Sequence, residues 1–355
     1  MSKTIILTGG GTAGHVTPNI ALLPGLRARG FEIRYIGSYA GMEKGRIEAE
    51  GVPYDGVSTG KLRRYLSLKN FSDIGHVLKG IREAKALLKK YQPDVIFSKG
   101  GFVSVPVVRA AKSLKIPVII HESDMTPGLA NKLCYSAASK ICCNFPETVA
   151  MLPAEKAVLS GSPIREQLLS GSREKGLTFT GFSGEKPVLL MIGGSSGAKK
   201  LNEVLRQALP ALLPDFDVIH LCGRGNLDES LKDTAGYVQY EYISAELPDL
   251  FAACDIVFSR AGANAICELL ALQKPALLTP LSAAVSRGDQ ILNAKSFEKQ
   301  GFSMLVEEEN LTADVLVDSL KKLYENRGTY VEAMAKSTQK NGVDVILGLV
   351  DEIVK

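Results

Sequence analysis

Short apolar runs alternate with longer amphipathic stretches along most of the chain. The runs are rich in β-branched residues, which is typical of buried strands, whereas the stretches between them predict helices. This alternation predicts an α/β fold with a parallel sheet in each half of the chain and helices on both faces of each sheet. The predicted strands are residues 4–8, 31–36, 94–98, 117–121 and 140–143 in the first half, and residues 187–192, 216–222, 255–258, 275–279 and 302–306 in the second.

Two of the predicted strands end in glycine-rich turns. Residues 8–15 read TGGGTAGH and residues 193–198 read GGSSGA, and a helix-like stretch follows each. Glycine lets the backbone approach a ligand closely, and a helix start offers N–H groups and a positive dipole end to an anion. One such turn is weak evidence. Two of them, each opening its own α/β half, predict two Rossmann-like domains that face a phosphate-bearing ligand across a cleft.

The length of the chain also favours two domains, because 355 residues are many for one core. The hinge is expected near residues 161–165, ahead of a loose segment at 170–186 that contains several glycines. The predicted domains are residues 1–162 and 163–335. A helical tail at 336–355 is expected to pack back on the first domain.

Composition fits a globular protein, since 45% of the residues are hydrophobic. No apolar run reaches the roughly 18 residues that a membrane span needs, and the N-terminus has no signal-peptide layout. The six cysteines lack zinc-ligand spacing. We interpret them as reduced core residues of a cytoplasmic protein.

The net charge of +4 hides an asymmetry between the two halves. Residues 1–165 hold 23 cationic and 12 acidic side chains, whereas the remainder holds 19 and 26. A basic first half predicts an acidic partner, which could be a phosphate, an anionic lipid or a nucleic acid. Within it, residues 61–71 interleave cations with Leu, Tyr and Phe, a pattern that suits a segment lying on an anionic bilayer. RNA binding needs the same features, and a surface loop over the core is the structural alternative.

Two side chains in the first half are candidate general bases. His15 stands beside the first glycine turn at a predicted helix start, where the dipole disfavours an imidazolium and leaves a neutral ring that can take a proton. Glu122 follows the strand at 117–121, at the sheet edge where open α/β folds bind ligands. It could bond sugar hydroxyls or assist a base. The structural alternatives are a histidine that only lines its turn and a carboxylate that caps a helix.

Lys99, Gly100 and Gly101 follow the strand at 94–98, so they also lie at a carboxyl edge. Lys99 is a candidate phosphate partner, and the alternative is a tight turn into a helix.

In the second half, SRAGANAICE at residues 259–268 follows the strand at 255–258. Its small residues would let a diphosphate approach the helix start, and Glu268, one turn further on, could reach ribose hydroxyls. Asp289 and Gln290 lead another helix and are placed for contact with a sugar.

These motifs together resemble the MurG family of bacterial glycosyltransferases, which add GlcNAc to lipid I, a muramoyl-peptide carried on undecaprenyl diphosphate. The resemblance runs in family order over nearly the whole chain. It implies the two-domain GT-B fold, with UDP-GlcNAc held mainly by the second domain and lipid I by the first. The supporting stretches are GGGTAGHVTP (9–18), PDVIFSKGGFVSVP (93–106), PVIIHESDMTPGLANK (117–132), GSPIR (161–165), IGGSSGAKKLN (192–202), SRAGANAICELLALQKPALLTPL (259–281) and GDQILNAK (288–295).

The resemblance also implies roles for single residues. His15 would be the catalytic base, with Glu122 as the other candidate, and no cofactor or metal is expected because no DxD-like pair ends a strand. Acceptor contacts would come from Gly10, Gly11, Lys99, Gly100 and Gly101. Donor contacts would come from Thr12, Ala13, Gly14, Arg165, Ser195, Ile243, Ala263, Asn264, Ala265, Glu268 and Gln290.

Three positions depart from the family pattern. Ala13 replaces a common glycine, and Asp124 stands where many members carry Asn. Asp289 and Gln290 stand where others have two glutamines, so the sequence leaves open which of them reads the donor sugar.

The expected function is inverting transfer of GlcNAc from UDP-GlcNAc to the muramoyl 4-hydroxyl of lipid I, which forms lipid II for peptidoglycan synthesis. The protein is expected to act peripherally at the cytoplasmic face of the cell membrane and to bind no nucleic acid. Cell-wall synthesis and division proteins are candidate partners.

Three other functions stay open. Another GT-B enzyme could glycosylate a different lipid, such as a diacylglycerol. A nicotinamide-dependent oxidoreductase also uses glycine turns, but Ile36, Gly37 and Ser38 stand where its acidic residue would end the second strand. A nucleotide-binding module would bind UDP-GlcNAc without turnover.

Overall fold

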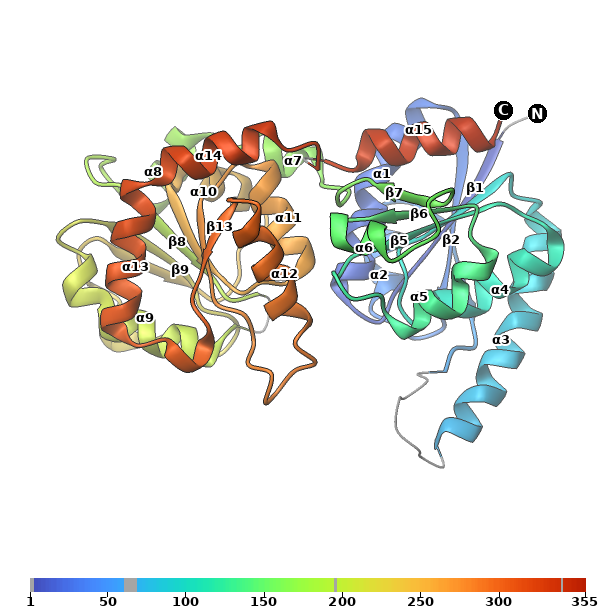
Figure 1. The fold of residues 1–355 in the computed structure, drawn as a ribbon, viewed down its shortest axis with the longest axis horizontal. Coiled ribbons are helices and arrows are strands. Elements are labelled where there is room, and N and C mark those ends of the chain that lie inside the picture. Colours follow the sequence, from blue (N-terminus) through green and yellow to red (C-terminus); the bar gives the residue numbers. More distant parts are fainter. Residues whose placement is uncertain (1–2, 61–68, 195–196, 340) are drawn as a thin grey trace. The chain divides into compact units, whose positions relative to one another are not determined.

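The computed structural model describes residues 3–60, 69–194, 197–339 and 341–355, with the side chains of residues 69–72 left out of the description. Its contacts divide the chain into two compact units (Figure 1). Unit 1 is Met1–Arg165 with Asn341–Lys355, and unit 2 is Glu166–Lys340. The sequence placed these divisions after residues 162 and 335, whereas the contacts place them after 165 and 340.

Unit 1 is built on a seven-stranded parallel sheet with the order β3-β2-β1-β4-β5-β6-β7. Thr8 at the end of β1 pairs with Ser98 at the end of β4, and Glu122 at the end of β5 pairs with Cys143 at the end of β6. Residues that follow these strands therefore meet at one carboxyl edge. The strands are β1 (Lys3–Thr8), β2 (Phe31–Ser38), β3 (Tyr54–Val57), β4 (Val95–Ser98), β5 (Val118–Glu122), β6 (Lys140–Cys143) and β7 (Ala157–Leu159).

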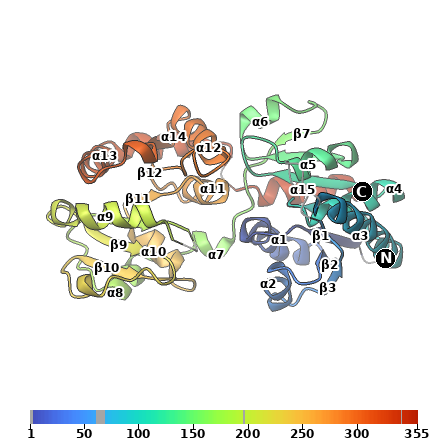
Figure 2. The same cartoon turned by 90° about the horizontal axis from the view of Figure 1, so that it is seen from below.

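Helices cover both faces of this sheet. Alternate residues of β1 face opposite ways, so that Ile5 packs in a core with α1 and α15 while Ile6 packs in a core with α3 and α4. Figures 1 and 2 show α15 lying along unit 1, where Leu347 is 2% exposed. The helices are α1 (Thr17–Ala28), α2 (Glu43–Ala49), α3 (Lys69–Tyr91), α4 (Ser104–Leu114), α5 (Leu129–Cys134), α6 (Pro146–Ala150) and α15 (Val343–Ile353).

Unit 2 repeats the plan with a six-stranded parallel sheet in the order β10-β9-β8-β11-β12-β13. Its strands are β8 (Val188–Ile192), β9 (Asp217–Leu221), β10 (Tyr237–Tyr240), β11 (Ile256–Ser259), β12 (Ala276–Leu278) and β13 (Ser303–Leu305). Its helices are α7 (Glu166–Leu169), α8 (Arg173–Thr180), α9 (Lys199–Leu212), α10 (Leu247–Ala253), α11 (Ala263–Ala271), α12 (Asp289–Lys299), α13 (Ala313–Glu325) and α14 (Arg327–Lys336).

The predicted α/β class and the parallel sheets are confirmed. The expected loose segment at 170–186 is wrong in its central part, because α8 (Arg173–Thr180) lies within it. Ser172 caps this helix by accepting a hydrogen bond from Lys175 N, and Gly181 ends it at φ +75°. The glycines that suggested a loop include the one that terminates the helix.

Candidate functional site

The glycine turn at residues 9–11 packs against Gly100 and Gly101, which form a second glycine turn after β4, at the carboxyl edge of the unit 1 sheet. A Cβ atom on Gly101 would collide with the carbonyl oxygen of Gly10, and one on Gly11 would lie 2.6 Å from the ring of Phe102. Gly11 and Gly101 also have φ values of +83° and +81°, which only glycine adopts readily. Protein packing alone therefore accounts for these glycines, and their predicted contact with the acceptor, like that of Gly100, stays a prediction.

A carboxylate that the sequence did not single out holds the first of these turns. Glu43, at the start of α2, is completely buried. Its Oε1 accepts hydrogen bonds from the backbone N (3.0 Å) and Oγ (2.5 Å) of Ser38, and its Oε2 accepts from Gly11 N at 3.4 Å. The only local signal was an acidic residue in a first helical turn, which is too common to indicate a site.

His15 is half-buried and ends a short 3₁₀ turn, Ala13–His15. Its Nδ1 lies 3.0 Å from Thr12 Oγ1. Burial and, to a lesser extent, the charge of Lys99 together lower the pKa of His15 to about 4, against the raising effect of a hydrogen bond with the Gly10 backbone. The ring is thus neutral near pH 7. The helix-start explanation is corrected, because α1 begins only at Thr17 and the cause is burial beside a cation.

Lys99 follows β4 and is only 1% exposed. Its Nζ bonds to Ser123 Oγ, and its backbone N donates to Thr8 O at 2.9 Å. The charge of this ammonium is close enough to His15 to lower the pKa of the imidazole. Its predicted contact with an acceptor phosphate stays a prediction.

Glu122 ends β5 and is 4% exposed. Its Oε2 accepts from Gly128 N (3.0 Å), Asn131 Nδ2 (3.0 Å) and Tyr135 Oη (3.4 Å), and its Oε1 accepts from Ser123 N (3.2 Å). Burial raises the pKa of Glu122 to about 7, against the lowering effect of the Asn131 and Gly128 hydrogen bonds. The carboxylate therefore organises the loop between β5 and α5, and its oxygens are engaged by protein donors.

Several buried acceptors at the same edge have no hydrogen-bond partner among the described residues. His121 Nε2 lies 3.0 Å from Gly161 O, so this nitrogen carries the proton and Nδ1 is left as an unpaired acceptor. The Oδ1 atoms of Asn19, Asn131 and Asn144 are unpaired as well. Such atoms require water or ligand donors, so this edge is suited to polar contact.

The start of α11 in unit 2 is less crowded by neighbouring atoms than the glycine turns of unit 1. Gly262 precedes the helix, and among the described residues no atom outside its chain neighbours lies within 4 Å of the position its Cβ would occupy. Asn264, Ala265 and Glu268 are half-buried, whereas Ala263 is 7% exposed. The backbone N–H groups of the first turn therefore stand at an accessible place, as anion binding requires.

Asp289 and Gln290, the two residues predicted to contact the donor sugar, each have a protein partner at the start of α12. Gln290 Oε1 accepts from Leu281 N at 3.1 Å. An Asp289 oxygen lies 3.0 Å from an Arg287 nitrogen. Each carboxyl or amide thus has one partner from the loop that precedes the helix.

The remaining predicted donor contacts are scattered along the chain. Thr12 is exposed, while Ala13 and Gly14 are half-buried in the 3₁₀ turn. Arg165 is the last residue of unit 1 before the chain enters unit 2, and its Nε is buried without a described partner. Ile243 is half-buried between β10 and α10. Ser195 lies outside the described residues.

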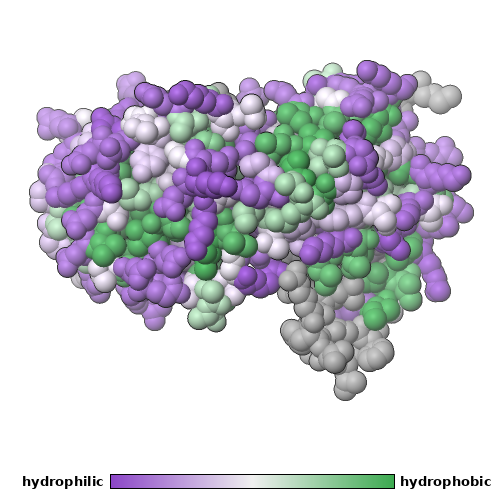
Figure 3. Space-filling model, viewed as in Figure 1, coloured by the Kyte–Doolittle hydropathy of each residue, from purple (hydrophilic) through white to green (hydrophobic). Residues whose placement is uncertain are grey.

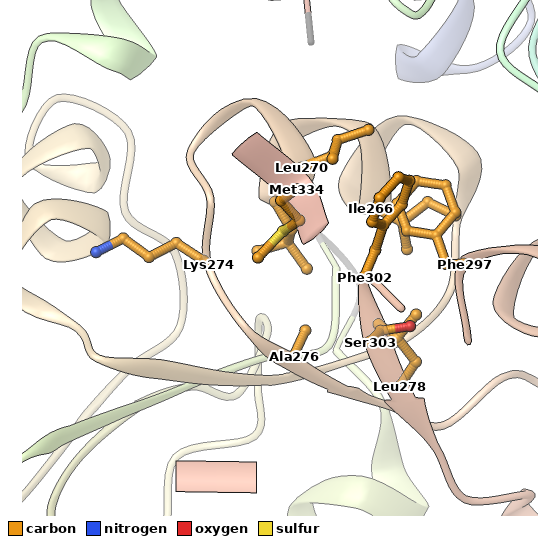
Figure 4. Close-up of a pocket in the computed structure, with 10 residues that line it drawn as sticks. Ile266, Leu270, Lys274, Ala276, Leu278, Phe297, Phe302, Ser303 and Met334 are labelled. Carbon is orange, nitrogen blue, oxygen red and sulfur yellow. The ribbon is translucent and has the colours of Figure 1, made fainter. Parts of the chain in front are cut away.

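An apolar pocket behind α11 supports this helix and is not a ligand site for a polar donor. Figure 4 shows Ile266 and Leu270 of α11 together with Phe297, Phe302 and Met334 around it. The two phenylalanine rings meet edge to face at 5.5 Å. Because the lining is almost wholly apolar, the pocket belongs to the packing that fixes α11 on the sheet.

The outer side of α3 carries exposed apolar side chains. Ile74 and Leu78, one turn apart, are 48% and 54% exposed, and Figure 3 shows apolar residues gathered over this helix. Lys79 and Arg82 beside them are exposed cations. Residues 61–68, most of the predicted membrane segment, lie outside the described residues. No helix in the described part of the chain combines the length and apolar character needed to cross a bilayer.

Comparisons with known proteins agree with this architecture. The glycosyltransferase family 28 N-terminal domain matches residues 5–143, and the family's C-terminal domain matches residues 188–347. A UDP-N-acetylglucosamine–N-acetylmuramyl-(pentapeptide) pyrophosphoryl-undecaprenol N-acetylglucosamine transferase from Lachnoclostridium phytofermentans is 63% identical over 351 residues, which cover 99% of both chains.

The protein of the same name from Lachnospira eligens is 60% identical over 350 residues, with 99% of both chains covered. A crystal structure of MurG from Acinetobacter baumannii is 25% identical and superimposes with a TM-score of 0.78 over 99% of both chains.

Proposed function

The chain belongs to glycosyltransferase family 28, and on that premise we propose that it transfers GlcNAc from UDP-GlcNAc to lipid I and so forms lipid II for peptidoglycan synthesis. The observation that carries the proposal is 63% identity over 99% of the chain to a transferase of that name. The predicted resemblance to the MurG family is confirmed. The chain is a UDP-GlcNAc-dependent N-acetylglucosaminyltransferase.

The donor is bound mainly by unit 2 in this proposal. The first turn of α11 meets the diphosphate, and Glu268 accepts hydrogen bonds from the ribose hydroxyls. Gln290 or Asp289 forms hydrogen bonds with the GlcNAc hydroxyls. Ile243 contacts the uracil, and Thr12, Ala13, Gly14, Arg165 and Ser195 complete the diphosphate and sugar contacts. The open position at Gly262 and the half-exposed side of α11 support this assignment.

The acceptor is bound by the glycine turns of unit 1, at Gly10, Gly11, Lys99, Gly100 and Gly101. The muramoyl 4-hydroxyl oxygen attacks the anomeric carbon from the face opposite the leaving group, UDP departs, and the configuration inverts. His15 takes the hydroxyl proton, which its neutral ring allows. Negative charge that develops on the departing diphosphate is stabilised by the N–H groups of α11 and by Arg165.

A direct test measures UDP release from labelled UDP-GlcNAc in the presence of a lipid I analogue. Product should appear only with both substrates present. Replacing lipid I with a diacylglycerol tests the alternative lipid glycosyltransferase, and UDP-GlcNAc binding without release of UDP would instead identify a binding module. Faster turnover with diacylglycerol than with lipid I would refute the proposed acceptor.

Peripheral contact with the cytoplasmic face of the cell membrane is the second part of the proposal. Ile74 and Leu78 would enter the interface while Lys79 and Arg82 meet anionic headgroups. The other side of α3 packs on α4, which leaves this face available. Cell-wall synthesis and division proteins are the expected protein partners at that membrane, and no nucleic acid is expected to bind.

The membrane contact can be tested with vesicles that contain phosphatidylglycerol. Replacing Ile74 and Leu78 together with Gln should weaken binding about tenfold, because apolar area leaves the interface. The matched control replaces Leu227 and Val315 of unit 2, which are 45% and 37% exposed, and should bind as the unmodified protein does. Equal binding by the α3 variant would rule out this face.

A further inference from the structure

Two charged side chains of unit 2 form a largely shielded ion pair next to the loop that leads to α12. Arg260 directly follows β11, and Glu308 belongs to a 3₁₀ turn after β13. Their side chains are 12% and 14% exposed, and Arg260 Nη2 donates to Glu308 Oε1. A pair so shielded from water must compensate for its desolvation by further hydrogen bonds.

Those further bonds all go to one short stretch of backbone. Arg260 Nη1 donates to the carbonyl oxygens of Thr279 and Pro280, both at 3.1 Å. Glu308 Oε2 accepts from Ser282 N at 3.1 Å. The two side chains, here called the Arg260–Glu308 clamp, thus fix the chain just after β12 from both ends of the ion pair.

The clamped stretch is in turn bonded to the start of α12. Leu281 N, between the clamped positions, donates to Gln290 Oε1 at 3.1 Å. Asn293 Nδ2 donates to Ala261 O, in the turn before α11, at 3.4 Å. Figures 1 and 2 show α11 and α12 side by side. The clamp therefore sets where Gln290 stands relative to the first turn of α11.

We propose that Arg260 and Glu308 are positioning residues for recognition of the donor sugar, which hold residues 279–282 so that Gln290 and Asp289 meet GlcNAc. The inference rests on the proposed function, which gives the nucleotide to α11 and the sugar to the start of α12. Neither member of the clamp touches the donor. Loss of the clamp lets the backbone at Leu281 move. Gln290 then loses the hydrogen bond from Leu281 N that orients its side-chain oxygen.

The test compares the dissociation constants of UDP and UDP-GlcNAc, measured by calorimetry. Glu308→Gln removes the charge but keeps the size, and Arg260→Lys keeps the charge but loses the fork that reaches two carbonyls. Each variant should bind UDP-GlcNAc about tenfold more weakly, as expected for the loss of one charge-assisted hydrogen bond, and bind UDP within about twofold of the unmodified protein. The double variant should be no weaker than the weaker single variant, because both break one clamp.

Lys295→Gln is the matched control, since it breaks an exposed 3.3 Å pair with Glu307, the neighbour of Glu308. It should leave both affinities unchanged, and retained UDP binding shows that each variant is folded. Equal losses for UDP and UDP-GlcNAc, or no loss in either clamp variant, would overturn the inference. An unmodified protein that binds neither nucleotide would instead refute the proposed function.

Discussion

The glycine turns of unit 1 and the start of α11 in unit 2 differ in what surrounds their glycines. At the edge of unit 1, Cβ atoms on Gly10, Gly11 and Gly101 would collide with protein atoms, and the charged groups Lys99 and Glu122 are 1% and 4% exposed. In unit 2, by contrast, the Cβ position of Gly262 is open. Close packing is not confined to unit 1, because Cβ atoms on Gly193 and Gly197 of unit 2 would also collide with backbone atoms. The accessible backbone is therefore a property of the start of α11.

This difference predicts that residues of unit 1 act in the chemical step and that the start of α11 acts in donor binding. The unit 1 edge holds the proposed base, His15, whose pKa is lowered to about 4 so that its ring is neutral near pH 7. The unit 2 edge has the accessible helix start that our proposal assigns to the diphosphate. Changes in unit 1 should therefore affect the chemical step, and changes in unit 2 should affect donor binding.

The largest expected effect is at His15. His15→Ala should lower kcat by about 10²–10⁴-fold, because the general base is lost, and should leave UDP-GlcNAc affinity within a few fold. Steady-state kinetics and calorimetry measure the two quantities. His15→Gln keeps a hydrogen-bonding group but cannot take the proton, so it should be nearly as slow. A glutamine variant with most of the activity would show that His15 only positions substrate, and Glu122 would become the preferred base.

Glu268→Ala should raise the KM for UDP-GlcNAc about ten- to a hundredfold, since a charge-assisted hydrogen bond is worth roughly 1.5–3 kcal/mol. The value of kcat should change far less. Glu203→Ala on α9, a half-exposed carboxylate in an ion pair with Lys199, is the control. An unchanged KM in a folded Glu268 variant would remove this residue from the ribose site.

A smaller effect is expected for Gly262→Ala. Among the described residues the new methyl group meets no atom beyond the adjoining backbone, and Gly262 has an ordinary φ of −66°, so the melting temperature should stay the same or rise. A diphosphate close to the backbone would be pushed away, which should raise the donor KM about tenfold. The matched variant in unit 1, Gly10→Ala, should instead destabilise the fold, because its Cβ would lie 2.7 Å from the Glu43 carboxyl carbon. Equal changes of melting temperature and of donor KM in the two variants would contradict the difference between these two positions.

The smallest expected effect is the pH dependence of kcat/KM between about pH 6 and about pH 8. A base is active when deprotonated, and the pKa of His15 is lowered to about 4. If His15 is the base, kcat/KM should therefore fall only well below pH 6 and stay constant between about pH 6 and about pH 7. The pKa of Glu122 is raised to about 7. If Glu122 were the base, the rate would fall nearly tenfold for each pH unit below that value. An acid limb near pH 7 would therefore transfer the role to Glu122.

The sequence predicted the central strands well, because β-branched apolar runs are sufficient to identify buried parallel strands. It missed β3, β7 and β10, which lie at sheet edges and read YDGV, AVL and YVQY. Such strands are short or partly polar, so they lack the apolar run that identified the others.

The candidate site was predictable only where its determinants are local. Glycine turns at strand ends identified both carboxyl edges. The causes of the neutral state of His15 were not predictable, because its burial depends on tertiary packing and Lys99, the second cause, is brought near only by the β1–β4 pairing. The contact of Glu43 with Gly11 and the Arg260–Glu308 clamp were missed for the same reason, since they join residues that are 32 and 48 positions apart along the chain.

The return of the chain to unit 1 through α15 has a consequence for the order of folding during synthesis. Ile346, Leu347 and Val350 are at most 2% exposed and belong to the same core as Leu22 and Leu26 of α1. A ribosome makes these residues after all of unit 2. The core of unit 1 therefore stays incomplete until synthesis ends, whereas unit 2, whose residues 166–340 are continuous, can fold earlier.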